Sequence, residues 1–227
     1  MTHSDLFDYS TTKSDRYFTG ARNDYVSVLP DSSIANILEI GCGDGSTGAA
    51  ALAAGKCGRY VGIEIAEGPA ARARACLSDV RLGNVEVMDI TDPPETYDAV
   101  IASEVLEHLT DPWDVVRRLA ALLKPGGLFL ASSPNVAHHR IVRDLVRGRW
   151  RLADSGPMDR THLRWFTPES YRRMFEEAGL DVIHSAGVAP LGPRARVLSR
   201  LTGGRINHLF YTQNNIHARK PLSSRQG

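Results

Sequence analysis

Short runs of apolar and β-branched residues alternate along this chain with segments that favour helix, and this alternation limits the possible folds more than any other feature. Strand, helix and strand in succession build a parallel sheet with right-handed crossovers. The sequence therefore predicts an α/β fold. The expected strands are Ile37–Ile40, Tyr60–Ile65, Val85–Asp89, Tyr97–Ala102 and Leu128–Ala131, and the expected helices are Thr47–Ala54, Pro69–Leu77 and Asp111–Leu123.

The pattern changes after Asn135. A basic helix is expected over His138–Arg149, and a second helix over Tyr171–Ala178 that begins at Thr167 and Pro168. Two closing strands, Asp181–Gly187 and Leu209–Ala218, are expected with a basic loop between them. We divide the chain into an N-terminal helical cap segment (1–35), a single domain (36–220) with an insertion that covers the acceptor (135–166), and a frayed tail (221–227).

Composition excludes several classes of protein. With 227 residues and 42% hydrophobic content, the chain can bury a core without disulfides, and three cysteines are too few for a disulfide framework or a zinc ribbon. The sequence contains no secretory signal and no apolar run of the roughly 18 residues that span a bilayer, so we expect a cytoplasmic protein without membrane insertion. Residues 135–227 carry 16 Lys and Arg against 7 Asp and Glu, which favours an anionic partner.

A glycine-rich loop, Gly41-Cys42-Gly43-Asp44-Gly45, directly follows the first expected strand. Glycines at this turn let the backbone approach a ligand at a helix N-terminus. The loop lacks the spacing of a dinucleotide or triphosphate loop, and Glu39 and Asp44 place negative charge beside it. Acidic flanks disfavour a pyrophosphate and suit a cationic ligand with an amino-acid end, which points to S-adenosylmethionine.

Two further acidic residues follow the next expected strands. Glu64 lies at the end of the second strand, where a carboxylate accepts hydrogen bonds from both hydroxyls of a ribose. Asp89 closes the third expected strand, where it would face an adenine. Because ligands bind at the carboxyl edge of open α/β sheets, these groups are expected to share one site.

Residues 36–218 resemble the class I S-adenosylmethionine-dependent methyltransferases. The stretch Leu38–Gly45 looks like the first motif of that family, and Leu123–Leu128 looks like its turn before the fifth strand. The resemblance implies a Rossmann-like, seven-stranded, mostly parallel sheet with strand seven antiparallel, helices on both faces and a small helical lid. It implies that the cofactor S-adenosylmethionine is bound by Glu39, Gly41, Cys42, Gly43, Glu64, Ile65, Asp89, Ile90 and Ser103.

The stretch from Glu104 to His108 carries the candidate acceptor chemistry. If it is helical, Glu104, Glu107 and His108 share one face. The stretch resembles one in the ubiquinone-biosynthesis O-methyltransferases and in enzymes that methylate the 3′-terminal 2′-hydroxyl of small RNAs. That resemblance implies a divalent metal, such as Mg²⁺, with His162 as a fourth ligand. A metal-free acid–base role and a purely structural role remain open.

The insertion 135–166 is rich in basic and aromatic residues, which suits an anionic acceptor. The stretch Ser133–Asn135, the basic helix and the block Asp159–Thr167 also resemble methyltransferases encoded among bacterial surface-polysaccharide genes. An N-terminal segment of this kind often covers the cofactor in the superfamily, so Tyr17 is a candidate contact. The basic and tryptophan residues of the insertion are His138, His139, Arg140, Arg143, Arg147, Arg149, Trp150, Arg151, Arg160, Arg164 and Trp165.

The sequence thus predicts a methyltransferase that acts on a hydroxyl of a sugar, a glycan or a related natural product, with a role in polysaccharide biosynthesis. Two alternatives remain: a small-RNA 2′-O-methyltransferase and a non-catalytic protein that binds S-adenosylmethionine. Residues 1–134 are acidic and no separate RNA-binding module is evident, so nucleic acid is the less favoured partner. The sequence leaves open a homodimer.

Overall fold

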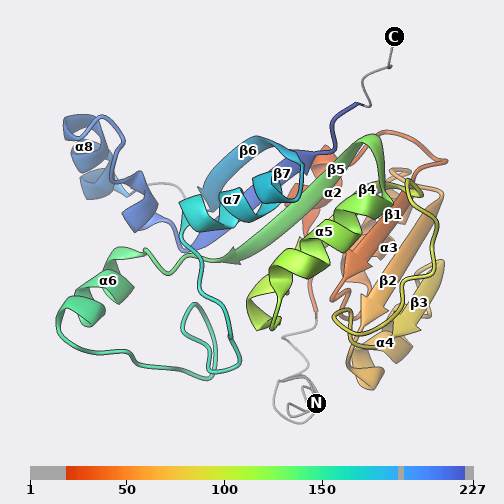
Figure 1. Ribbon diagram of the computed structural model, residues 1–227, viewed down its shortest axis with the longest axis horizontal. Coiled ribbons are helices and arrows are strands. Elements are labelled where there is room, and N and C mark those ends of the chain that lie inside the picture. Colours follow the sequence, from red (N-terminus) through yellow and green to blue (C-terminus); the bar gives the residue numbers. More distant parts are fainter. Residues whose placement is uncertain (1–18, 189–191, 223–227) are drawn as a thin grey trace.

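One seven-stranded sheet runs through the computed structural model, which describes residues 19–188 and 192–222 (Figure 1). Its strand order is β3-β2-β1-β4-β5-β7-β6. The first five strands pair in parallel, and β7 runs antiparallel to both β5 and β6. This topology confirms the fold that the resemblance implied. The strands are β1 (Asn36–Ile40), β2 (Arg59–Glu64), β3 (Asp79–Leu82), β4 (Tyr97–Ser103), β5 (Leu123–Pro134), β6 (Asp181–Val188) and β7 (Gln213–Arg219).

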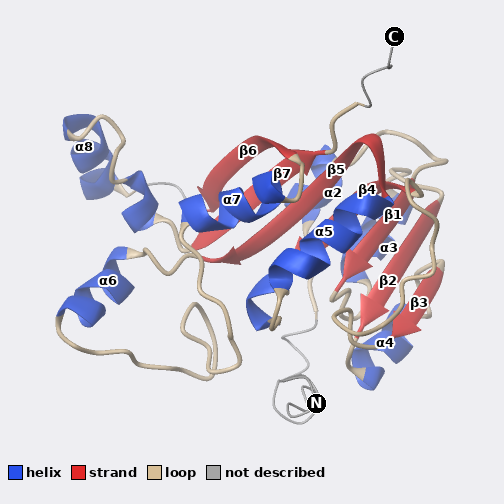
Figure 2. Ribbon diagram, in the orientation of Figure 1, coloured by secondary structure: helices blue, strands red, loops and turns tan. Residues whose placement is uncertain are grey.

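Helices cover both faces of the sheet (Figure 2). The helix expected to begin near Asp111 does so for a local reason, because the Asp111 side chain accepts a hydrogen bond from the Asp114 amide at 3.0 Å. The helices are α2 (Asn23–Val28), α3 (Ser46–Ala53), α4 (Glu67–Ala73), α5 (Pro112–Leu122), α6 (His139–Val146), α7 (Pro168–Glu177) and α8 (Pro193–Leu201), with 3₁₀ turns η3 (Leu106–His108) and η4 (Asn207–Phe210).

The core consists of two apolar layers, one on each face of the sheet. Successive side chains of a strand point to opposite faces, so Leu38 packs in one cluster with Leu119 of α5 and Phe175 of α7. Its neighbour Ile37 packs in the other cluster with Tyr25 of α2. In the view of Figure 1, α5 and α7 lie in front of the sheet while α2 and α3 lie behind it. Burial on both faces fixes the strands and therefore the loops at their carboxyl ends.

The prediction of a strand over Val85–Asp89 is wrong. The third strand is β3, which ends before Gly83, and the following residues form a turn. The Asn84 side chain accepts a hydrogen bond from the Glu86 amide at 2.9 Å, and the Asn84 carbonyl accepts one from the Met88 amide at 2.9 Å. These local bonds compete with strand pairing, and they override the alternation of valines that suggested a strand.

The segment between β6 and β7 also differs from the expected basic loop. It contains α8 and η4, and β7 begins only at Gln213. A proline at the first helical position, Pro193, starts α8. The expected helix over 138–149 is shorter, because α6 ends at Val146 and Gly148 adopts φ +70°. Tyr17 and most of the expected tail lie outside the described residues.

Candidate active site

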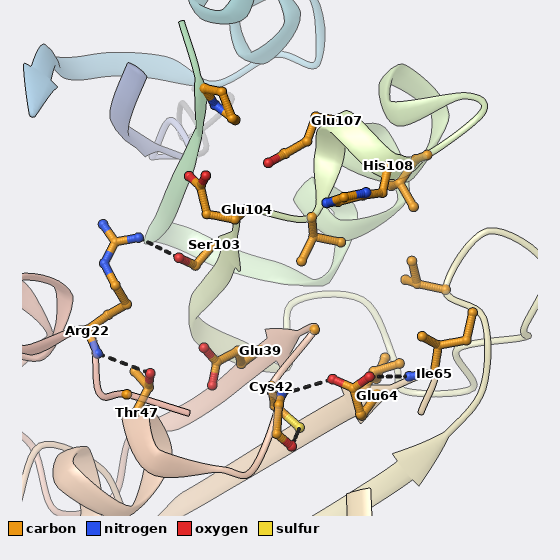
Figure 3. Close-up of a pocket in the computed structure, with 18 of the residues that line it drawn as sticks. Arg22, Glu39, Cys42, Thr47, Glu64, Ile65, Ser103, Glu104, Glu107 and His108 are labelled. Atoms are coloured by element: carbon orange, nitrogen blue, oxygen red, sulfur yellow. Dashed lines mark hydrogen bonds between the residues drawn. The ribbon is translucent and has the colours of Figure 1, made fainter. Parts of the chain in front are cut away.

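A cleft of about 830 Å³ opens at the carboxyl ends of β1, β2 and β4 (Figure 3). Open α/β sheets bind ligands at this edge. Most of the predicted cofactor, catalytic and metal-binding residues line the cleft, and the exceptions among them are Asp89 and Ile90. The residues brought together there are Glu39, Gly41, Cys42, Gly43, Glu64, Ile65 and Ser103 from the expected cofactor set and Glu104, Glu107, His108 and His162 from the expected acceptor set.

The glycine-rich loop needs glycine at its first position. Gly41 has φ +65°, and a Cβ atom there would lie 2.4 Å from the Val105 side chain. The Gly41 amide donates to the Ile63 carbonyl at 2.8 Å, and the Gly43 amide donates to a carboxylate oxygen of Glu64 at 2.9 Å. These bonds bind the loop to the end of β2 and leave a bare backbone surface for a ligand.

Glu64 is buried at the end of β2 and its carboxylate is fixed by the backbone. One oxygen accepts from the Ile65 and Ala66 amides, both at 2.9 Å, and the other accepts from the Gly43 amide. Burial raises the pKa of Glu64, and the three backbone hydrogen bonds oppose that rise. The carboxylate is therefore held in one position before any ligand arrives.

Glu39 is buried beneath the loop at the end of β1. The Tyr60 hydroxyl donates to its carboxylate at 2.9 Å. Burial raises the pKa of Glu39 from 4.5 to about 8, although the Tyr60 hydrogen bond and the Arg22 charge act in the opposite direction. A cation bound in the cleft would favour the ionised form of this carboxyl group.

The residues at the end of β3 differ from those expected. Asp89 is exposed, and Ile90 packs against the core instead of lining the cleft. Asn84 and Val85 line the cleft in their place, because the strand ends seven residues earlier than predicted. The Gly83–Asn84 pair was the sequence signal for a turn at this point.

Arg22 is a cleft residue that sequence reasoning missed. Its guanidinium donates to the hydroxyl of Ser103, donates to that of Ser132 at 2.8 Å, and forms an ion pair with Asp24 at 2.8 Å. The Arg22 amide donates to the Thr47 hydroxyl at 3.3 Å. Arg22 stands before α2 and belongs to no motif, so only the packing of α2 against the sheet brings it to the cleft.

Three acceptor-side residues converge at the other end of the cleft. A ligand atom of each of Glu107, His108 and His162 lies within 4.8 Å of the others. Glu107 is 1% exposed, and neither of its carboxylate oxygens has a hydrogen-bond partner among the described residues. Burial, and next the neighbouring carboxylate of Glu104, raise the pKa of Glu107 well above its usual range. A bound cation or a proton would compensate this buried carboxyl group.

Backbone carbonyls orient both histidines. Nδ1 of His108 lies 3.2 Å from the Thr161 carbonyl oxygen, and Nδ1 of His162 lies 3.3 Å from the Pro157 carbonyl oxygen. In a neutral ring, the nitrogen beside a carbonyl carries the proton, so Nε2 carries the lone pair. Both rings can therefore offer Nε2 as a base or as a metal ligand.

Glu104 does not share a helical face with Glu107 and His108, as the sequence had suggested. It has φ +54° at the end of β4, and the following turn η3 is a single 3₁₀ turn. Its carboxylate lies between Arg22 and Glu107 (Figure 3), outside the three-residue cluster. Glu104 thus lies between the part of the cleft that contains Arg22 and the part that contains Glu107.

The insertion 135–166 contributes Gly156, Pro157, Asp159 and His162 to the cleft. The described side chains of the other predicted lid residues do not line it. Trp150 and Trp165 pack against each other with ring centroids 5.3 Å apart. The arginines of this segment therefore have no role at the cleft wall.

A sequence model for the methyltransferase domain matches residues 15–185, three quarters of the chain. The chain belongs to this methyltransferase family. A protein of Mycolicibacterium smegmatis named as a probable S-adenosylmethionine-dependent methyltransferase is 32% identical over 167 residues, which cover 70% of this chain and 59% of the relative. A ubiquinone biosynthesis O-methyltransferase of Methylobacterium nodulans is 31% identical over 188 residues, 80% of this chain and 73% of the relative.

Solved structures show the same fold at low identity. An S-adenosylmethionine-dependent methyltransferase of Mesorhizobium loti superposes with a TM-score of 0.62 and 18% identity, over 88% of this chain and 98% of the other. A phosphoethanolamine N-methyltransferase of Haemonchus contortus, in complex with S-adenosyl-L-methionine, superposes with a TM-score of 0.67 and 16% identity, over 97% and 60%. The family thus implies S-adenosylmethionine as the cofactor of this methyltransferase.

The stability of the ligand-free methyltransferase should fall as the pH rises from about 5 to 8. In the unfolded chain Glu39 ionises near 4.5, whereas in the folded chain its pKa is about 8. Between these values the unfolded state binds fewer protons, so raising the pH favours unfolding. Urea titrations at several pH values should show that Glu39→Gln flattens this dependence. Equal slopes of unfolding free energy against pH for both proteins would show that Glu39 is ionised in the folded chain over this whole pH range. The charged or titratable groups that act on Glu39 are Tyr60, Glu64, Arg22 and Asp44.

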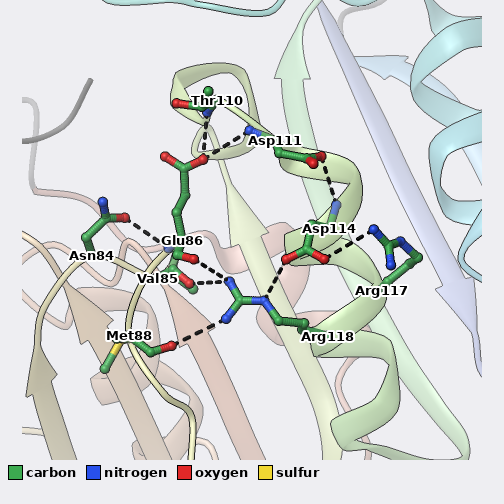
Figure 4. A network of polar contacts seen from close by, with 9 residues as sticks. All are labelled: Asn84, Val85, Glu86, Met88, Thr110, Asp111, Asp114, Arg117 and Arg118. Carbon is green, nitrogen blue, oxygen red and sulfur yellow. Dashed lines mark hydrogen bonds and ion pairs between the residues drawn. The ribbon is translucent and has the colours of Figure 1, made fainter. Parts of the chain in front are cut away.

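A polar network fixes the loop that carries Asn84 and Val85 (Figure 4). The Arg118 guanidinium on α5 donates to the Glu86 carbonyl at 3.1 Å and to the Met88 carbonyl at 3.3 Å. In return, the Glu86 carboxylate accepts from the backbone amides that lead into α5, at 2.8 and 3.0 Å. The cofactor-side loop and the segment after His108 are therefore held together.

We expect Arg118→Met to destabilise the methyltransferase by about 1–3 kcal/mol, because partly buried carbonyl oxygens lose their donor. It should also weaken binding of S-adenosylmethionine, since the loop over Asn84 loosens. Arg117→Met is the matched control: Arg117 is exposed and pairs only with Asp114 among the contacts described, so a change within about 0.5 kcal/mol is expected. Urea unfolding and calorimetry measure both effects, and equal behaviour of the two variants would contradict the role of the network.

Proposed function

We propose that this protein transfers the methyl group of S-adenosylmethionine to a hydroxyl group of a sugar, a glycan or a related small natural product. The observation that carries the proposal is the cluster of Glu107, His108 and His162 at one end of the cofactor cleft. Relatives named as ubiquinone biosynthesis O-methyltransferases support oxygen as the acceptor atom.

The cleft fits S-adenosylmethionine. Gly41 and Gly43 line the cleft and would present their backbone to the nucleoside, and the fixed carboxylate of Glu64 would accept hydrogen bonds from the ribose hydroxyls. Asn84 and Val85 would contact the adenine, and the Arg22 guanidinium would face the carboxylate of the amino-acid end. When bound, the cofactor supplies an electrophilic methyl group.

The residues at the acceptor end would bind the hydroxyl and remove its proton. Nε2 of His108 or His162 is the base in a metal-free reaction. The same Nε2 atoms and the unpartnered Glu107 carboxylate also fit a divalent cation such as Mg²⁺, Mn²⁺ or Zn²⁺, which would lower the pKa of the hydroxyl. Either way, much of the rate comes from holding the acceptor oxygen in line with the methyl group.

The acceptor class is inferred from the polar side chains that line the cleft. Asp159, Thr212 and Gln213 are among the lining residues, together with the histidine cluster. Several hydrogen-bonding side chains suit an acceptor with several hydroxyl groups, as in a sugar. This chemistry is consistent with a role in polysaccharide biosynthesis.

The test is transfer of labelled methyl groups by EDTA-treated protein, with and without added Mg²⁺, Mn²⁺ or Zn²⁺. The acceptor probes are simple sugar glycosides with vicinal hydroxyls, catechol and a short RNA. Methylation of a glycoside or a catechol hydroxyl supports the proposal. Methylation of RNA alone would favour the small-RNA alternative, and binding of the cofactor without transfer to any probe would favour a non-catalytic binding protein.

Metal use is tested separately by calorimetry. A metal isotherm that Glu107→Ala abolishes would assign Glu107 as a ligand. Absence of an isotherm, with and without acceptor, would assign the proton transfer to a histidine.

A further inference from the structure

Helices α6 and α8 lie at the end of the molecule opposite β3, away from the main body (Figure 1). They adjoin through η4, since Nδ1 of His139 in α6 lies 3.0 Å from the Leu209 carbonyl oxygen and its ring packs near that of Phe210. An amphipathic helix of a globular protein normally buries its apolar face, yet α6 buries no residue.

Apolar side chains are concentrated on the surface here. Segments 142–152 and 197–201 contain eight of the sixteen large exposed hydrophobic residues among those described. Val146 is 83% exposed and Leu201 is 78% exposed. We call the exposed apolar side chains of these two segments the α6–α8 patch. Trp150 also belongs to it and is partly exposed.

The chain around the patch is strongly basic. Residues 138–152 contain five arginines and one aspartate, and residues 192–206 contain four arginines and no acidic residue, although the whole chain has a net charge of only +1. The aspartate, Asp144, already lies 3.5 Å from the Arg143 guanidinium. None of the described basic side chains of these two segments lines the cleft. Their positive charge is therefore available to a partner other than the proposed acceptor in the cleft.

We propose that the α6–α8 patch docks this protein on the surface of an anionic lipid bilayer. Short helices with apolar side chains between arginines bind at the boundary of lipid headgroups and acyl chains. None of the described helices has the length and apolar character to cross the membrane.

Two other partners fit the patch less well. A second copy of the chain would bring an equally basic surface against it, and the like charges would repel. A nucleic acid would pair with the arginines, but it would leave the aliphatic side chains of Val146 and Leu201 against phosphates and sugars. A bilayer surface satisfies both the charge and the apolar side chains.

Docking in this way has a consequence that rests on the proposed function. The segment that follows α6 continues to Pro157 and His162, which line the acceptor end of the cleft. The patch and the cleft are thus joined by one stretch of chain. An acceptor whose sugar hydroxyl is attached to a lipid could reach the cleft from the membrane surface.

The test is co-sedimentation of the full chain with vesicles of phosphatidylcholine alone or of equal parts phosphatidylglycerol and phosphatidylcholine. We expect binding to the anionic vesicles only, weakened by salt. The double variant Val146→Ser/Leu201→Ser should bind at least about tenfold more weakly. Ile34→Ser is the matched control, because Ile34 is 85% exposed but lies outside the patch, and it should bind like the wild type.

Several results would overturn the proposal. The first is that the wild type does not bind anionic vesicles. The second is that the double variant binds them as tightly as the wild type. The third is that the wild type is a dimer and the double variant is a monomer. Binding to a short RNA that the double variant weakens, without vesicle binding, would assign the patch to nucleic acid instead. The vesicle assay needs no methyl acceptor, so failure of the proposed activity would leave its outcome intact.

Discussion

Replacing Glu64 by alanine is expected to raise the dissociation constant for S-adenosylmethionine by about 100-fold or more. Hydrogen bonds to a charged group contribute about 1.5–3 kcal/mol each, and the proposed ribose contact contains two of them. The carboxylate also anchors the glycine-rich loop through the Gly43 amide at 2.9 Å and the start of α4 through the Ala66 amide at 2.9 Å. Its loss therefore removes both the ligand contact and the order of the loop. Calorimetric titration measures the change.

Two further variants separate these contributions. Glu67→Ala removes an exposed glutamate at the start of α4 that pairs with Arg74, and should leave affinity unchanged. Glu64→Gln keeps the volume of the side chain and one acceptor oxygen, so we expect an intermediate loss of affinity for S-adenosylmethionine. Its circular dichroism spectrum should be that of the folded protein. If Glu64→Ala folds and binds S-adenosylmethionine as tightly as the wild type, Glu64 does not contact the ribose.

Replacing His108 by alanine should lower turnover by about 10²- to 10⁴-fold, the range typical of a lost general base. The expected change in cofactor affinity is small, because His108 lies at the acceptor end of the cleft, away from the Glu64 side (Figure 3). The measurement is transfer of labelled methyl groups to whichever probe the wild type methylates. His184→Ala is the control, since His184 is exposed on β6 and does not line the cleft.

The same variant distinguishes the two roles of His108. If the histidine is a metal ligand, His108→Ala should lose the metal isotherm along with turnover. If it is the base, the metal isotherm is unaffected and the pH dependence of turnover changes. A large loss of cofactor affinity would instead place His108 in the cofactor pocket.

The parts of the fold that depend on local patterns could be predicted from the sequence. The first two strands and the glycine-rich loop were predicted because apolar runs, glycines and acidic residues occur together at short spacing. The position of Glu64 followed from the end of β2. The strand that became β7 was expected from the sequence over Leu209–Ala218, whereas its antiparallel orientation came only from the family resemblance.

Other features depend on competition between local hydrogen bonds and strand pairing, or on tertiary packing. Alternating valines suggested a strand at Val85–Asp89, but the side-chain and backbone bonds of Asn84 formed a turn instead. Glu104 adopts φ +54°, which residues with a side chain rarely take, so spacing alone misplaced its carboxylate. Arg22 reaches the cleft only because Tyr25 and the rest of α2 pack on the sheet.

The position of β7 between β5 and β6 has a consequence for synthesis of the chain. β6 leaves the ribosome before β7, yet among the described strands β6 pairs only with β7, through Asp181 and Arg219 at one end and Val188 and Gln213 at the other. A nascent chain that has not yet exposed Gln213–Arg219 therefore has an unpaired β6 and an open edge on β5. Such edges invite pairing with other chains. The second half of the sheet can close only after β7 has left the ribosome, and until then β5 and β6 are exposed to other chains.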